Sequence, residues 1–375
     1  MIPYSTQLIE QDDIDAVVEV LKSPFLTQGK QVELFEKSLC DYSGAKYAIT
    51  FNSATSALLG AYTVCNIKKD DEIITTPISF VATSNMFVYL GAKPIWCDVK
   101  LDGNIDESLI EKLITPRTKA IVGVDFAGKP LEMQKIKDIA KKHNLLFIDD
   151  ASHALGSSID AKKVGSFADM SILSFHAIKP ITTGEGGAVL TDNEELATKL
   201  KLFRSHGIVK KELWNSDMIS QGHNFRLTEF AAALGISQLK KLDGFVKRRN
   251  EIAAYYDERF KGEKFFLTQK IPLHVVSSRH LYPIILNPEF HCQKEDIFKE
   301  LQAKDLGVQV HYKPIYQNSF YKEQFGDITL RVTEDFYKSE ISIPCHQKMT
   351  QEDALFVADT FLEVLGKYSH RGSCF

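Results

Sequence analysis

The feature that most constrains the fold of this chain is an alternation of short apolar strands with helices, from about residue 45 to about residue 202. Strands are predicted where apolar runs end at a turn, and helices where apolar residues recur every three or four positions. The predicted strands are Tyr47–Ile49, Glu72–Thr75, Pro94–Cys97, Ala120–Val124 and Leu145–Ile148, and the predicted helices include Phe80–Leu90 and Met133–His143. Strands that are apolar throughout are buried on both faces. The pattern therefore predicts an α/β fold in which helices cover both sides of a mostly parallel sheet.

A change of pattern near residue 243 predicts a second, smaller domain. With 375 residues the chain exceeds the roughly 250–300 residues that a single core usually supports. Beyond residue 243 a long charged helix leads into an α+β pattern. Its predicted elements are the helix Phe245–Phe260, the strand Leu281–Leu286, the helix Lys294–Ala303, the strand Val308–Val310 and the helix Gln351–Leu365. We therefore predict an N-terminal arm at 1–30, a large domain at 31–243 and a small C-terminal α+β domain at 244–375.

The charge and the cysteines narrow the class of protein. A net charge of −4 gives no electrostatic footprint for nucleic acid or for an anionic membrane. No run approaches the roughly 20 apolar residues that a membrane helix needs, and the N-terminus lacks the basic-then-apolar pattern of a signal peptide. The six cysteines are scattered and contain no CxxC pair, so their spacing indicates neither a metal site nor a disulfide framework. We expect a cytoplasmic protein with reduced thiols.

In a mostly parallel sheet, ligands bind beyond the carboxyl ends of the strands, so the residues that follow each strand are the candidates for a site. After the first strand, Ser53, Ala54 and Thr55 stand at a helix start, where backbone N–H groups and hydroxyls can hold a phosphate. Taken alone, simple N-capping explains them as well. After the second strand comes Phe80, which could stack on a flat ring or belong to the core.

Two further strand ends carry a carboxylate and a lysine. Asp149 and Asp150 end one strand, and because neighbouring side chains point to opposite faces, only one of them need face a site. The next strand ends at Ser174, and Lys179 follows in SILSFHAIKPITTGEGG, held between apolar residues, proline and glycines. Such a lysine is either an imine-forming amine or a strand-end charge that reaches solvent. Both readings stay open for this segment alone, as does the reading of the aspartates as solvated acids.

Taken together and in chain order, these residues supply a phosphate cradle, a stacking ring, a carboxylate and an imine-forming lysine. A buried carboxylate can keep a pyridine nitrogen protonated, which makes the ring an electron sink. The set therefore matches pyridoxal phosphate. Neither GxGxxG nor GxxxxGK[ST], the patterns expected of dinucleotide and Walker-type ATP sites, occurs in the sequence.

The sequence also resembles a known family along nearly its whole length. The runs FNSATSALL, TTPISFVATSN, IDDASHALGS, SFHAIKPITTGEGG and GHNFRLTEFAAALGISQL are similar to those of the DegT/DnrJ/EryC1/StrS sugar aminotransferases, a branch of the fold-type I pyridoxal-phosphate enzymes. This resemblance implies a large domain with a mostly parallel sheet, flanked by helices, and a smaller C-terminal α+β domain. It also implies a homodimer with composite active sites.

Residue roles follow from the resemblance, position by position. It implies that Lys179 binds the cofactor covalently and moves protons, that Asp150 pairs with the pyridine nitrogen, and that His153 contacts the phenolic oxygen. The remaining implied cofactor contacts are Ser53, Ala54, Thr55 and Ser174 at the phosphate, Phe80 on the ring, and Asn224 from the neighbouring subunit. The implied substrate contacts are Tyr4, Thr27, Gly29, Arg226, His311, Tyr312 and Lys313. No metal is implied.

The resemblance also suggests a reaction. ISFVAT, SHALGS, FRSHG and VHYKPIYQ are similar to the branch of the family that acts in pseudaminic acid biosynthesis. This branch transfers the amino group of L-glutamate to C4 of a UDP-4-keto-6-deoxy-N-acetylhexosamine. The alternatives are another 4-amino sugar, of the perosamine, bacillosamine or 4-amino-arabinose type, and a non-catalytic regulator or sensor that keeps the fold. The residues themselves do not distinguish C3 from C4 amination.

Overall fold

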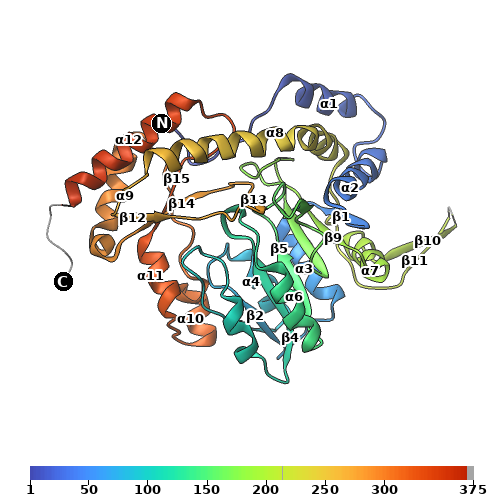
Figure 1. Cartoon of the computed structure of the whole chain (residues 1–375). Coiled ribbons are helices and arrows are strands. Elements are labelled where there is room, and N and C mark those ends of the chain that lie inside the picture. The colour runs from blue at the N-terminus through green and yellow to red at the C-terminus, as the bar shows by residue number, and fades with distance from the viewer. Residues whose placement is uncertain (213, 370–375) are drawn as a thin grey trace.

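The computed structural model describes residues 1–212 and 214–369, and its centre is a seven-stranded sheet (Figure 1). The strand order is β1-β9-β8-β5-β4-β2-β3, and only β9 runs against the others. The strands are β1 Tyr47–Phe51, β2 Glu72–Thr75, β3 Lys93–Trp96, β4 Thr118–Val124, β5 Leu146–Asp150, β8 Met170–Ser174 and β9 Gly187–Thr191. The predicted α/β class with a mostly parallel sheet is confirmed.

Helices cover both faces of this sheet, because alternate side chains of each strand point to opposite sides. In β4, Val122 packs in one apolar cluster together with α3, whereas Ile121 packs in another together with α6. Similarly, in β9, Val189 and Leu190 belong to different clusters. The helices around the sheet are α2 Lys30–Ser43, α3 Ala54–Val64, α4 Ala82–Tyr89, α5 Glu107–Ile110, α6 Met133–Lys142 and α7 Glu194–Arg204.

One long helix, α8 (Glu229–Arg259), joins the large sheet to the C-terminal part of the chain. The prediction that this helix begins at Phe245 is wrong, since it starts 16 residues earlier (229 against 245). Gly235 lowers the helix propensity of the early part. The glycine is nevertheless required there, because a Cβ would lie 2.6 Å from the Phe35 ring. The predicted boundary between 243 and 244 falls inside α8, and the division into domains stays a prediction.

The C-terminal part has its own small sheet and core. Strand β14 (Tyr282–Leu286) lies between β12 (Phe266–Thr268) and β15 (Glu340–Ile343), and the second half of α8 packs against them through Ile252 and Tyr256. The helices here are α9 Lys294–Ala303, α10 Ser319–Phe325, α11 Arg331–Ser339 and α12 Gln351–Tyr368. The predicted strand Val308–Val310 is wrong: only Gln309 pairs, in an isolated bridge to Ser342, since the segment is a crossing loop that meets β15 at one residue.

The N-terminal segment connects the two parts. Ile2 bridges to Leu306, the Tyr4 carbonyl accepts the Cys345 N–H at 3.1 Å, and the Ser5 hydroxyl donates to the Ile178 carbonyl at 3.1 Å. Helix α1 (Gln11–Leu21) then packs on α8. The remaining strands are β6 Ser158–Ile159 and β7 Lys162–Lys163, which form a small sheet with β13 Val275–Val276, and the hairpin β10 Ile208–Glu212 with β11 Asn215–Met218.

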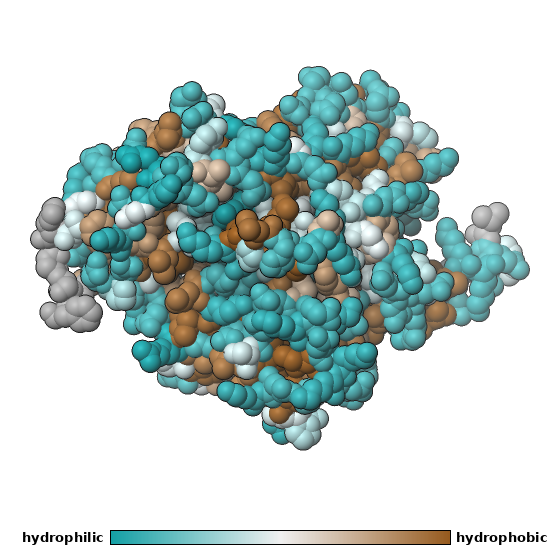
Figure 2. Space-filling model, viewed as in Figure 1, coloured by the Kyte–Doolittle hydropathy of each residue, from teal (hydrophilic) through white to brown (hydrophobic). Residues whose placement is uncertain are grey.

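The surface and the cysteines complete this description. Hydrophilic side chains predominate on the face shown in Figure 2, and none of the helices in residues 1–212 and 214–369 is long and apolar enough to cross a membrane. Cys40, Cys65, Cys97 and Cys345 are free thiols, but Cys292 is disulfide-bonded. The expectation of reduced thiols throughout is therefore wrong at Cys292, because sequence spacing carries no information about pairs that only the fold brings together.

Candidate active site

A cavity of about 650 Å³ lies at the carboxyl ends of the central strands, where the strand order predicts a ligand site. It gathers side chains that follow β1, β2, β5 and β8, together with side chains from the N-terminal segment and the C-terminal part. The predicted residues that line it are Tyr4, Ser53, Ala54, Thr55, Phe80, Asp150, His153, Ser174, Lys179, His311 and Tyr312. Residues that are far apart in the sequence thus form one chemical site.

Lys179 lies in this cavity on the loop that follows β8. Its backbone N–H donates to the His176 carbonyl at 2.9 Å, so the chain turns back directly after the strand. Burial lowers the pKa of the amine to about 8, although the Asp150 carboxylate acts in the opposite direction. The Nζ atom lies 3.5 Å from His280 Nε2. Roughly a tenth of the amine is therefore uncharged at pH 7 and about half at pH 8, far more than for an exposed lysine, and imine chemistry requires this uncharged form.

Asp150 is fixed at the end of β5 by two donors. The Thr83 hydroxyl donates to its carboxylate at 2.6 Å and the Ser152 N–H does so at 3.2 Å. Asp149 lies on the other face of the strand, where its carboxyl group accepts from the Ser171 hydroxyl at 3.3 Å. Burial, followed by the nearby charge of Asp150, raises the pKa of Asp149 to about 8. Of the two acids, only Asp150 lines the cavity.

The start of α3 forms another wall. Ser53 caps this helix by accepting the Ser56 N–H at 3.1 Å, and the N–H groups of Ala54 and Thr55 in the same first turn have no acceptor within the helix. Gly187 on β9 allows this close approach, because a Cβ there would lie 2.5 Å from the Ala54 nitrogen. The helix start is therefore open to the cavity and suited to an anion.

Aromatic rings form a further part of the cavity lining. The Tyr312 hydroxyl lies 3.2 Å from His153 Nε2, and the His153 and His280 rings are 4.4 Å apart. Burial, and then the charge of Lys179, lowers the pKa of both histidines well below the usual value, so both are neutral. Phe80 is 60% exposed and stands 6.5 Å from the Tyr312 ring, which leaves one face available to a flat ligand.

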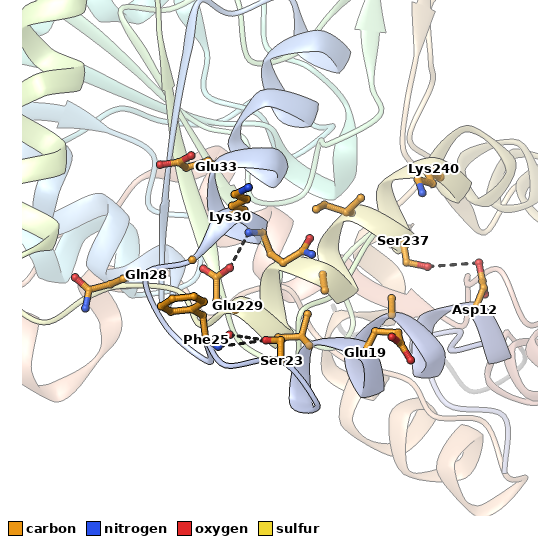
Figure 3. A pocket seen from close by; sticks show the side chains of 16 residues that line it. Asp12, Glu19, Ser23, Phe25, Gln28, Lys30, Glu33, Glu229, Ser237 and Lys240 are labelled. Atoms are coloured by element: carbon orange, nitrogen blue, oxygen red, sulfur yellow. Dashed lines mark hydrogen bonds between the residues drawn. The ribbon is translucent and has the colours of Figure 1, made fainter.

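Five predicted residues lie elsewhere in the chain. Thr27, Gly29, Asn224, Arg226 and Lys313 do not line this cavity. Gly29 lines a separate cavity of about 780 Å³, between α1, the start of α2 and α8, where Glu229 accepts the Gln31 N–H (Figure 3). The loop of Thr27 and Gly29 meets the start of α8, five residues beyond Asn224, since the Glu229 N–H donates to the Leu26 carbonyl at 3.0 Å. The roles of all five stay predictions.

Thr83 and Ser79 belong to the site, and sequence reasoning missed them. The Ser79 hydroxyl lies 2.7 Å from that of Thr83, which in turn holds Asp150. The two residues are four apart, with Ser79 in the bend that precedes α4 and Thr83 in the first turn of this helix. Two hydroxyl side chains four residues apart, directly after β2, were the feature of the sequence that could have identified them.

We expect Thr83→Val to reduce kcat by roughly tenfold to a hundredfold, the usual cost of losing a hydrogen bond to a charged group. Valine keeps the shape of threonine but cannot donate to Asp150. Thr83→Ser restores the donor and is expected to recover most of the rate. Steady-state kinetics of the three proteins measure this effect, and equal rates for the valine variant and the native protein would remove Thr83 from the account.

The residues fit pyridoxal phosphate. The Lys179 amine with its lowered pKa, the anchored Asp150 carboxylate and the open start of α3 face one cavity, and a Cβ on Gly187 would close the helix start. In this fit, the helix start and Ser174 would hold the phosphate, Asp150 the pyridine nitrogen and Phe80 one face of the ring. When bound, the group supplies an aldehyde that combines with amines and a ring that takes up an electron pair.

Because only the uncharged amine reacts with an aldehyde, the pKa of Lys179 predicts how binding depends on pH. We expect the rate at which cofactor-free protein binds pyridoxal phosphate covalently to rise with pH and to level off above about pH 8, since that pKa is lowered to about 8. Stopped-flow absorbance of the cofactor measures it. A rate that keeps rising toward the ordinary lysine pKa would show that the amine is not desolvated.

Comparisons of the sequence with known proteins indicate the same class of enzyme as the residues of the cavity do. Residues 7–362 match the DegT/DnrJ/EryC1/StrS aminotransferase family. The chain is 54% identical to a UDP-4-amino-4,6-dideoxy-N-acetyl-beta-L-altrosamine transaminase of Campylobacter jejuni, over 100% of both chains. It is 49% identical to the protein of the same name from Helicobacter pylori, over 97% of this chain and 98% of that one.

Solved structures show the same fold. Helicobacter pylori PseC, described as an aminotransferase involved in the biosynthesis of pseudoaminic acid, superposes with a TM-score of 0.95 at 49% identity, covering 98% of this chain and 99% of that one. Spr1654 of Streptococcus pneumoniae, described as a sugar aminotransferase and solved in a PLP form, superposes with a TM-score of 0.93 at 29% identity, covering 98% and 99%. The family match over nearly the whole chain agrees with the lysine, carboxylate and helix start in one cavity, and the chain belongs to the DegT/DnrJ/EryC1/StrS aminotransferase family.

Proposed function

We propose that this protein transfers the amino group of L-glutamate to C4 of a UDP-4-keto-6-deoxy-N-acetylhexosamine, using pyridoxal phosphate. The product would be UDP-4-amino-4,6-dideoxy-N-acetyl-β-L-altrosamine, in pseudaminic acid biosynthesis. The observation that carries this proposal is the cavity in which the Lys179 amine, the Asp150 carboxylate and the start of α3 meet. The full-length similarity to transaminases named for that product supports the choice of sugar.

Each polar side chain of the cavity has a different role in the proposed reaction. Lys179 provides an amine that can combine with the cofactor aldehyde and, once released, can take a proton from one carbon and deliver it to another. Asp150 remains a fixed negative charge, held by Thr83 and by the Ser152 N–H, where it stabilises a protonated pyridine nitrogen. Neutral His153 and Tyr312 present a hydrogen-bonded pair to a bound group. Glutamate and the sugar would enter the same cavity in turn, as in a ping-pong mechanism.

We propose that a second copy of the chain completes the site. Asn224 is exposed, and the adjoining hairpin β10–β11 extends away from the body (Figure 1). Its apolar side chains are unusually exposed: Trp214 is 82% and Met218 69% accessible. Apolar groups displayed on a projecting hairpin are suited to burial against another subunit. Thr27, Gly29 and Arg226 lie on the segments next to Asn224 and would then face the partner's cavity.

This arrangement predicts complementation between two inactive variants. Asn224→Ala removes a group donated to the neighbouring site, and Lys179→Ala removes the amine of the chain's own site. In a random mixture of subunits, half of the dimers are mixed and each of these has one intact site, so roughly a quarter of the native activity should return. Activity after unfolding and refolding the two variants together measures this. No recovery, from variants that each form dimers, would contradict a composite site.

A comparison of substrates tests the proposed sugar. The enzyme is incubated with L-glutamate and, separately, with UDP- and GDP-linked 4-keto-6-deoxy sugars of the altrosamine, bacillosamine and perosamine types, and products are resolved by mass spectrometry. We expect the highest kcat/KM for the UDP sugar that leads to the altrosamine product. A higher value for another sugar would move the protein to a different branch of its family. Purified protein without the absorbance of covalently bound cofactor would favour a regulator or sensor.

A further inference from the structure

Strand β15 places two polar side chains behind His311. Glu340 and Ser342 are two residues apart, so they share one face of the strand, while Ile341 and Ile343 pack into the core on the other. The Glu340 carboxylate accepts the His311 backbone N–H at 2.7 Å and the Ser342 hydroxyl at 2.5 Å. The Ser342 oxygen lies 2.8 Å from His311 Nδ1. All three residues are buried, and their contacts form a continuous chain.

The number of hydrogen-bond donors among Glu340, Ser342 and His311 determines where each proton lies. A serine hydroxyl has one hydrogen, and an ionised carboxylate can only accept. The hydrogen of Ser342 therefore goes to Glu340, because the alternative places two oxygen lone pairs 2.5 Å apart. The Ser342 oxygen can then only accept from the ring, so Nδ1 of His311 must carry a proton. A neutral imidazole has one N–H, and Nε2 is left as an acceptor.

We propose that Glu340 and Ser342 are positioning residues that hold His311 in the Nδ1–H form, so that Nε2 accepts a hydrogen bond from a hydroxyl of the bound sugar. The identity of the ligand rests on the proposed function, whereas the protonation of the ring does not. His311 lines the cavity, with Tyr4 5.4 Å and Tyr312 4.9 Å from its ring. A ring nitrogen fixed as an acceptor selects hydroxyl donors and cannot act as a general acid.

Burial and the positive charge of Lys179 keep the His311 ring neutral. Burial, and then the charge of Lys179, lowers the pKa of the His311 ring to about 3. Burial raises the pKa of Glu340 to about 7, against the opposing charge of Lys294, whose own pKa burial lowers to about 8. The hydrogen bonds from Ser342 and from the His311 N–H also lower the pKa of Glu340, because they stabilise its ionised form, and the assignment of protons applies to that form, which basic pH favours.

The test is nuclear magnetic resonance of the full-length holoenzyme, with its histidines labelled with the heavy nitrogen isotope, at about pH 8.5. The His311 signals are identified by their loss in His311→Gln. We expect Nδ1 to show the shift of a protonated nitrogen and Nε2 that of an unprotonated one. The reverse pattern, or averaged shifts for the two nitrogens, would overturn the proposal. This readout needs no sugar, so it succeeds or fails independently of the proposed function.

Variants of Ser342 test whether the protonation of the His311 ring affects binding of the nucleotide sugar. In Ser342→Ala, Nδ1 loses its acceptor, and we expect a shift toward the Nε2–H form and a rise of roughly tenfold in KM for the nucleotide sugar, with little change in KM for glutamate. Ser342→Thr keeps the hydroxyl and should restore both. Ser339→Ala is the matched control, because Ser339 makes a similar contact to His291 at 2.7 Å outside the cavity. An unchanged His311 spectrum in folded Ser342→Ala would contradict the positioning role.

Discussion

Replacing Lys179 with alanine is expected to lower amino transfer by at least about a thousandfold, because the change removes both the amine that combines with the cofactor and the group that moves the proton. The amine lies in the cavity with its pKa lowered to about 8 by burial, and the Asp150 carboxylate lies in the same cavity. The variant should also bind pyridoxal phosphate more weakly and lack the absorbance of covalently bound cofactor.

Two control variants show whether the loss of activity is specific to the Lys179 amine. Lys179→Arg keeps a positive charge but cannot combine with an aldehyde, so it should be as inactive as alanine. Lys367→Ala removes a surface lysine on α12 that is paired with Glu300, and it should leave kcat and the spectrum unchanged. Single-turnover kinetics and cofactor absorbance are the measurements. Full turnover by Lys179→Ala would show that Lys179 is not the catalytic amine.

The second large effect is expected at Asp150, and its neighbour provides the control. Asp150→Asn removes the negative charge that stabilises a protonated pyridine nitrogen, and we expect kcat/KM to fall by about a hundredfold to ten-thousandfold. Asp149→Asn should change it by less than about threefold. The reason is that burial and the charge of Asp150 raise the pKa of Asp149 to about 8, so the Asp149 carboxyl is already largely neutral near pH 7.

The pair is informative because both acids are buried on the same strand, so a general loss of stability would affect both variants alike. Kinetics and thermal unfolding of the two variants are compared side by side. Equal losses of activity, with folding preserved, would show that the two carboxyl groups do not have separate roles. A large loss confined to Asp149→Asn would exchange their assignments.

The parts of the fold that could be predicted are those that a local pattern determines. Helix α9 begins and ends at the predicted residues, and α6 ends one residue before the predicted end, since apolar periodicity and flanking residues define both. The site residues at strand ends were predictable because the rule for parallel sheets locates a ligand before any side chain is placed. The apolar strands and the order of the chain were sufficient for that.

The parts that could not be predicted depend on contacts between distant segments. Thr83 contributes to the site only because α4 brings it to Asp150, 67 positions along the chain. Likewise, β15 acquires its role by pairing with β14 and by meeting the His311 loop. Gly235 is tolerated inside α8 because the Phe35 ring leaves no room for a larger side chain. In each case the determining atom belongs to a residue that local patterns do not connect.

The proposed reaction transfers the nitrogen of glutamate to C4 of the UDP sugar by way of the cofactor, and it depends on Lys179 to move protons. The most direct test incubates the enzyme with the UDP-4-keto sugar and L-glutamate labelled with the heavy nitrogen isotope, then locates the label in the product by mass spectrometry and nuclear magnetic resonance. We predict one labelled nitrogen at C4, one 2-oxoglutarate released per amino sugar, and formation of both products at least about a thousandfold slower in Lys179→Ala. Label at C3, an unlabelled product, or formation of labelled product by Lys179→Ala at the native rate would contradict the account.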